Sequence, residues 1–275
     1  MEPLELLGIG FVAISIVLWI LLGIKLLFSY RRSPKPQTLS LALVLIFGGI
    51  AMLFLATEQI LLLTGADSTV GSTPIYNILS FSEIPNIFLL AFFAAALAWI
   101  SSGLAIILMN FFTISFFPDT SKKIIIAPIL VITLYLIIII FSPFQFAYTG
   151  SDWSPEHDST TNFILWILFL FPLWIVTFLF FYLSISLLRR GSPTWRRLFW
   201  IFIAQTLLSI GYTVEILNPP VFTGLINEVG IQISLLLSEA FWSTGSRFLM
   251  MIYPLLMWIG VFTPNWAKGL LGVSS

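Results

Sequence analysis

Residues 31–64 read RRSPKPQTLSLALVLIFGGIAMLFLATEQILLLT, a basic segment with two prolines followed by a long apolar run. Between Leu39 and Thr64 the only charged residue is Glu58. About 20 apolar residues in a helix cross the ~30 Å hydrocarbon core of a bilayer, and proline forbids the continuation of a preceding helix. The stretch therefore predicts a transmembrane helix that follows a basic loop.

The same pattern recurs along the chain and predicts an all-α, polytopic membrane protein, a single domain of seven transmembrane helices over residues 1–275. The expected spans are Leu6–Tyr30, Leu39–Thr64, Asn86–Phe112, Ile124–Ser142, Asn162–Leu188, Leu198–Leu217 and a seventh that begins between Asn227 and Ser238 and ends by Thr263. Composition agrees, because 9% of the residues are charged, against roughly 25% in soluble domains. Pro172 and Pro254 are expected to bend the fifth and seventh helices.

Basic residues gather in alternate loops and thereby predict the orientation. Lys25 lies about one turn from a helix end and can extend its amine to the interface. Ten other lysines and arginines lie in the loops after the first, third and fifth spans and in the tail: Arg31, Arg32, Lys35, Lys122, Lys123, Arg189, Arg190, Arg196, Arg197 and Lys268. The opposite loops hold none. The positive-inside rule then places the amino terminus outside, the carboxyl terminus in the cytoplasm and the protein in the cell membrane as a multi-pass chain.

Two parts of the chain resemble each other, which predicts an internal repeat. Arg31 precedes Glu58 by 27 positions and Arg189 precedes Glu215 by 26, each pair enclosing an apolar span. AWISSG at 98–103 also matches AFWSTG at 240–245. We expect a parallel 3+1+3 repeat: residues 1–117 form the first three-helix unit, 118–160 the linker helix and outer loop, 161–264 the second unit and 265–275 a short cytoplasmic tail. Alternating basic loops and apolar helices can produce part of this similarity through topology alone.

The last span contains SEAFWSTGSR at 238–247, with polar and charged residues at membrane depth. Such groups are costly to place in a bilayer and usually face a protein interior or a wet cavity. Glu239, Ser243 and Arg247 are spaced by four residues and share one helix face. Arg247 is about 25 Å from the inner end of its helix, hence in the outer leaflet.

Glu58, Tyr212 and Glu215 are expected at a similar depth, near the outer ends of their helices. Two interpretations stay open. The cluster is either an outward-facing pocket for a small ligand or ion, or an interhelical ion pair of Arg247 with a glutamate that fixes helix packing. The candidate residues are Glu58, Tyr212, Glu215, Glu239, Ser243 and Arg247.

Several kinds of chemistry lack their residues. The chain has no cysteine, and its one histidine, His157, lies in a loop without ligand spacing, so neither a metal nor another cofactor is expected. No glycine-rich phosphate loop occurs, and no nucleic-acid partner is expected. The topology is similar to that of rhodopsins, but the seventh span has no lysine for a retinal Schiff base. An enzyme is the least supported class.

The order of a basic pair, a proline, an apolar span and Tyr-x-x-Glu, from Arg189 through Tyr212 to Glu215, resembles the seven-helix amino-terminal sensor region of prokaryotic histidine kinases. The stretch from Arg31 to Leu61 resembles it less well. The resemblance implies an outward-facing ligand-sensing module. Because eleven residues follow Pro264, no effector domain is expected within this chain.

Three functions follow as hypotheses. The first is a receptor-like sensor that binds a ligand at the outer cluster and signals through the Arg31-Arg32 and Arg189–Arg197 loops to a cytoplasmic partner. Those loops also suit membrane lipids with anionic headgroups. The second is a transporter of small molecules or ions, and the third a structural subunit of a membrane assembly. A polar cavity continuing inward favours transport, whereas a site closed by packed phenylalanines below Arg247 favours sensing.

Overall fold

The computed structural model describes residues 3–66, 86–116, 122–149, 159–187, 192–217 and 239–262. Within these ranges every secondary-structure element is helical, which confirms the predicted all-α class with seven helices. The helices are α1 (Pro3–Arg32), α2 (Pro36–Ala66), α3 (Asn86–Ile114), α4 (Lys122–Thr149), α5 (Ser159–Tyr182), α6 (Pro193–Leu217) and α8 (Glu239–Phe262). A π-helical turn, η2 (Leu183–Leu187), continues α5.

The described helices are those of a multi-pass membrane protein. Six of them are long and apolar enough to cross a membrane, and the described side chains of α4 add a shorter apolar stretch, Ile126–Ile140. Large apolar side chains also cover the outside of the bundle, where Leu21 is 59% and Leu130 63% exposed. Such a surface suits lipid, because a water-facing surface of this kind would be an aggregation hazard.

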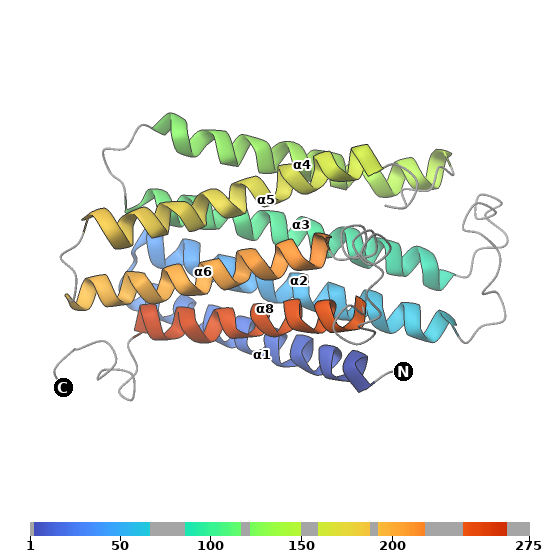
Figure 1. The fold of residues 1–275 in the computed structure, drawn as a ribbon, viewed down its shortest axis with the longest axis horizontal. Helices are drawn as coiled ribbons and strands as arrows, with labels where there is room; N and C mark the ends of the chain where they lie inside the picture. Colours follow the sequence, from blue (N-terminus) through green and yellow to red (C-terminus); the bar gives the residue numbers. More distant parts are fainter. Residues whose placement is uncertain are drawn as a thin grey trace, which may run out of the picture.

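The helices form a closed ring in chain order. Each packs against the next, from α1 through α6 to α8, and α8 returns to α1. α3 and α5 also contact each other directly, so α4 packs on the outside of this pair. α4 lies at the edge of the bundle farthest from α1 and α8 (Figure 1). We call the end that carries the carboxyl end of α1 and the start of α6 the basic end, since Arg31, Arg32, Arg196 and Arg197 lie there. The start of α1 lies at the opposite, amino-terminal end.

Trp19 of α1 joins three helices in the core. Its ring lies directly on Gly48 of α2, where a Cβ atom would overlap the ring. The same ring stacks on Tyr253 of α8 with the centroids 4.7 Å apart. Its Nε1 donates a 3.3 Å hydrogen bond to the Met250 carbonyl oxygen. That carbonyl is four residues before Pro254, which has no N–H to offer it, so Trp19 replaces the missing helical hydrogen bond.

The boundary between the fifth and sixth helices differs from the prediction. Residues 193–197 were expected in a loop but form the first turn of α6. The Ser192 hydroxyl accepts a 3.1 Å hydrogen bond from the Trp195 backbone N–H, and Pro193 suits the first helical position. Pro172 and Pro254 both lie inside their helices, as the sequence indicated.

The π-helical turn was not predicted. The expected fifth helix ran to Leu188, whereas α-helical geometry ends at Tyr182 and η2 follows. Within this turn the Ser184 carbonyl accepts a 2.6 Å hydrogen bond from Trp195 Nε1 of α6. A side chain from the next helix thus holds the wider turn in place.

Candidate functional site

Arg247 and Glu215 lie together near the amino-terminal end of the bundle. Arg247 Nη2 is 3.8 Å from Glu215 Oε1, and the two side chains are 13% and 19% exposed. The hydroxyl of Ser246, the residue before Arg247, donates a hydrogen bond to Glu215 Oε2. The carboxylate of α6 is therefore held by two consecutive residues of α8.

One donor of the Arg247 guanidinium has no partner among the described residues. Its Nε is buried, and no described group accepts a hydrogen bond from it. A Cβ on Gly8 would lie 2.9 Å from Arg247 Nη1 and 3.2 Å from Thr244 Oγ1, so glycine leaves room for the arginine against α1. An arginine has five N–H donors in a planar fork that matches a carboxylate or phosphate. The site therefore retains donor capacity beside the ion pair.

The other candidate residues are distributed differently. The Tyr212 hydroxyl shares a 3.0 Å hydrogen bond with the hydroxyl of Ser102 on α3, whereas Glu215 on the same helix pairs with Arg247 on α8. Glu58 lies in α2, and Glu239 and Ser243 lie in α8, but their side chains fall outside the described part of the structure. The structure thus brings Arg247 and Glu215 together and directs Tyr212 to a different helix.

Aromatic side chains fill the bundle on the basic side of the ion pair. Tyr253 is fully buried and stacks on Trp19, as described above. Phe169 contacts Tyr212 and Tyr135 at centroid distances of 5.3 and 5.2 Å. We call these described aromatic side chains, Trp19, Tyr253, Phe169, Tyr212 and Tyr135, the aromatic layer.

Two buried amides lie deeper in the bundle and were missed by sequence reasoning. Gln205 of α6 is fully buried, and neither atom of its amide has a hydrogen-bond partner among the described residues. Asn110 of α3 is also fully buried; its Nδ2 donates to the Ile106 carbonyl at 2.8 Å, while Oδ1 has no partner there. Each is an amide side chain inside an otherwise apolar span, and this pattern could have indicated a functional position, because polar residues within membrane spans are costly and often functional.

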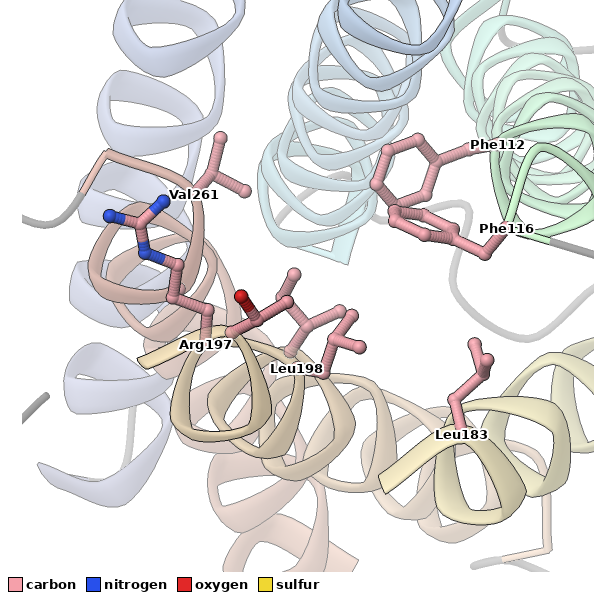
Figure 2. A pocket seen from close by; sticks show the side chains of 9 residues that line it. Phe112, Phe116, Leu183, Arg197, Leu198 and Val261 are labelled. Carbon is pink, nitrogen blue, oxygen red and sulfur yellow. The ribbon is translucent and has the colours of Figure 1, made fainter. Parts of the chain in front are cut away.

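A separate cavity of about 410 Å³ opens at the basic end between α3, η2, α6 and α8. Figure 2 shows Phe112, Phe116 and Leu183 facing Leu198 across the opening. Arg197 also lines the cavity, and its guanidinium extends past the edge of the opening, beside Val261. Thr194, Ile201 and Gly260 complete the lining. No sequence pattern indicated this cavity, because each helix contributes only ordinary apolar residues.

Lys25 reaches the same end of the bundle. Its Nζ lies 4.7 Å from the ring centroid of Phe262 and 5.3 Å from that of Trp258, both on α8. These are cation–π distances. Lys25 therefore interacts with the carboxyl end of α8; its expected extension to the membrane interface stays a prediction.

Together these features define an integral membrane protein of the multi-pass helical class, with a polar site near one end and an apolar cavity at the other. Among the residues that the structure describes, no three His, Cys, Asp or Glu side chains converge as metal ligands would. The chain matches no family model, no curated protein and no solved structure.

Proposed function

We propose that the chain is a receptor-like membrane protein that binds a small ligand with a carboxylate or another compact anionic group at Arg247. The observation that carries the proposal is the partly buried guanidinium: among the described residues its Nε has no hydrogen-bond partner, and its ion-pair contact with Glu215 is 3.8 Å long. Charge-assisted hydrogen bonds to an anion are shorter, at about 2.7–2.9 Å, and frequently bidentate. An incoming anion can therefore gain hydrogen bonds that Glu215 does not make.

Glu215 adds selectivity to this proposed site. Ser246 holds the carboxylate next to the guanidinium, so the site offers a negative and a positive group together. A ligand with both charges, such as an amino acid, suits this arrangement better than an anion alone. The resemblance to histidine-kinase sensor regions rests partly on Tyr212 and Glu215 and supports the same class, with signalling to a cytoplasmic partner through the loops at the basic end.

The aromatic layer supports sensing over transport. A ligand at Arg247 would meet the buried Trp19 and Tyr253 pair on its way toward the basic end. A site closed on one side can report binding without releasing its ligand there.

A thermal-shift screen of the purified protein in detergent tests the proposal. Small carboxylic acids, inorganic anions, amino acids, cations and lipids are added to wild type, Arg247→Ala, Arg247→Lys and the exposed control Arg32→Ala. A ligand at 100 times its Kd stabilises the folded state by about 2.7 kcal/mol. We expect an anionic or zwitterionic compound to stabilise wild type and Arg32→Ala, to stabilise Arg247→Lys less, and to leave Arg247→Ala unchanged.

The apo proteins provide a second readout. Arg247→Ala leaves the Glu215 carboxylate without its cation and should cost about 1–3 kcal/mol, below the range for fully buried pairs because both side chains keep some exposure. If this variant melts early but no compound stabilises wild type, the pair serves packing alone and the structural-subunit hypothesis is favoured. Equal stabilisation of wild type and Arg247→Ala would place the ligand elsewhere.

Transport is a second candidate, favoured by the buried amides. Among the described residues, the Gln205 amide and the Asn110 Oδ1 atom have no partner, and unpaired buried polar groups are costly unless a water, an ion or a substrate visits them. A compound found in the screen is therefore tested for uptake into proteoliposomes. Uptake that Gln205→Leu abolishes, without loss of binding at Arg247, would favour a transporter.

A further inference from the structure

The cavity at the basic end has the size and lining of a binding site. Its volume of about 410 Å³ lies within the ~300–1,000 Å³ range of small-molecule sites. Most of its wall is hydrocarbon or aromatic, from Phe112, Phe116, Leu183, Leu198 and Ile201. An occupant must therefore present mainly apolar surface.

Gly260 and the π-helical turn form two parts of the cavity wall. Gly260 lets α8 approach α6 so closely that a Cβ would lie 2.8 Å from Ile201 Cγ1 and 3.1 Å from the Arg197 carbonyl oxygen. Leu183, the first residue of η2, forms the opposite wall. π-helical turns are rare and occur frequently at functional sites.

Charge at the opening is positive. Arg197 lines the cavity, and Arg196 precedes it on α6. The acidic residues in the described ranges all lie toward the other end, at the start of α1 and α8 and near the end of α2 and α6: Glu5, Glu58, Glu215 and Glu239. An anionic group at the opening meets no described carboxylate.

The opening lies where two candidate membrane spans, Thr194–Glu215 and Thr244–Phe262, begin and end, and lipid headgroups are expected at such ends. Arg197 is four residues from the start of α6, hence about 6 Å along the helix, and Val261 is one residue before the end of α8. The apolar wall continues from there toward the bundle centre. A phospholipid has the matching arrangement, with a charged headgroup at the interface and apolar acyl chains deeper in the membrane.

We propose that this cavity binds an anionic phospholipid, with an acyl chain between Phe112, Leu183 and Ile201 and the phosphate at Arg197. A chain that leaves the bilayer for the cavity exchanges one apolar environment for another, so its burial adds little affinity. Selectivity must then come from the headgroup, because the arginines attract a net negative charge and gain little from a zwitterionic one. The inference is independent of the ligand proposed at Arg247, which lies on the other side of the aromatic layer.

Lipid retention tests the proposal. The full chain is reconstituted in nanodiscs with equal amounts of phosphatidylglycerol and phosphatidylcholine, extracted into mild detergent, and analysed by native mass spectrometry for retained lipid. We expect wild type to retain one phosphatidylglycerol in preference to phosphatidylcholine. Arg197→Gln should lower this preference about fivefold, which is the effect of one basic residue at a membrane surface. The matched control Arg32→Gln, at an exposed residue at the end of α1, should keep the preference.

A second variant tests the cavity without removing charge. Thr194 is exposed in the first turn of α6 and lines the opening, so Thr194→Trp should block the acyl chain and reduce retention while the fold remains. Equal retention of both lipids by wild type, equal losses in Arg197→Gln and Arg32→Gln, or full retention by Thr194→Trp would each overturn the proposal.

Two further experiments test whether a free fatty acid or the chain's own tail occupies the cavity instead. Free oleic acid is added in detergent, and a protein that binds this acid but retains no phosphatidylglycerol has a fatty-acid site instead. Deletion of residues 265–275 tests occupation by the chain's own tail. Lipid retention that appears only after the deletion would assign the cavity to the tail and overturn the lipid proposal.

Discussion

Trp19 shows how one side chain can fix the relative positions of three helices. Its ring needs the bare backbone of Gly48 on α2, and its N–H satisfies the carbonyl that Pro254 leaves open on α8. Stacking on Tyr253 adds a further contact between α1 and α8. The proline in α8 and the glycine in α2 are therefore accommodated by the same residue, although they are more than 200 positions apart.

Gly48→Ala should destabilise the protein through this residue. The added methyl group would displace the Trp19 ring and weaken its hydrogen bond to Met250, and overpacking of this kind costs about 1–3 kcal/mol. Thermal unfolding in detergent, followed by tryptophan fluorescence, measures the change. Gly10→Ala on α1 is the matched control, since nothing lies within 4 Å of its added Cβ, and it should be neutral or slightly stabilising. Equal melting of both variants would contradict the proposed role of Gly48.

At the candidate site, the sequence indicated the position of each residue along its helix, but not its partners. Residue counting placed Arg247 and three glutamates toward one end of their helices, but it left the partner of the arginine open. The pairing with Glu215 depends on the packing of α6 against α8, where a Cβ on Gly211 would lie 3.2 Å from the Ser246 carbonyl oxygen. Such a close approach between helices comes from tertiary packing, which spacing along one helix cannot specify.

The start of α6 shows why helix boundaries were less predictable than the helices themselves. Apolar length predicts a span with little ambiguity, but it says nothing about polar residues in a first turn. Trp195, Arg196 and Arg197 belong to α6 because Ser192 caps the helix and Pro193 begins it. Their helical placement brings Arg197 to the cavity and Trp195 to the carbonyl of Ser184.

Ser192→Ala should therefore loosen this end of α6. Loss of the capping hydrogen bond costs about 1 kcal/mol, and Ser192→Thr should restore most of it because its hydroxyl can accept the same N–H. Melting temperature measures the global cost, and hydrogen exchange at residues 193–197 measures local fraying. Unchanged exchange in Ser192→Ala would show that the Trp195 side chain alone holds this turn.

The cavity and η2 were beyond prediction for a different reason. A π-helical turn has no characteristic sequence pattern, and LSISL at 183–187 is typical of an ordinary membrane helix. The space itself arises where four elements meet, and its lining residues are separated by up to 149 positions, from Phe112 to Val261. Periodicity within each element gives no information on a gap between them.

The ring of helices bears on the predicted repeat without deciding it. Under that prediction α3 corresponds to α8 and α5 to α1. The third helix of each unit then contacts the first helix of the other, as α3 meets α5 and α8 meets α1. This pairing is what a pseudo-two-fold arrangement requires, but a ring in chain order also produces it. The parallel repeat stays a prediction.

Orientation can be tested directly because the chain contains no cysteine. We expect Ser33→Cys, between α1 and α2, to react with a membrane-impermeant maleimide only after cells are opened, and Asp152→Cys, in a predicted outer loop, to react in intact cells. Gel-shift labelling with a polyethylene-glycol maleimide measures both. The reverse pattern would place the basic end outside and contradict the predicted topology.

The closed ring of described helices also limits how the chain could be rearranged. α1 and α8 are neighbours, yet the start of α1 and the end of α8 lie at opposite ends of the bundle (Figure 1). In a soluble domain, neighbouring terminal elements allow circular permutation through a short polar linker. Here such a linker would have to cross the bilayer, so a permuted chain would need an added apolar helix of about 20 residues to join its ends.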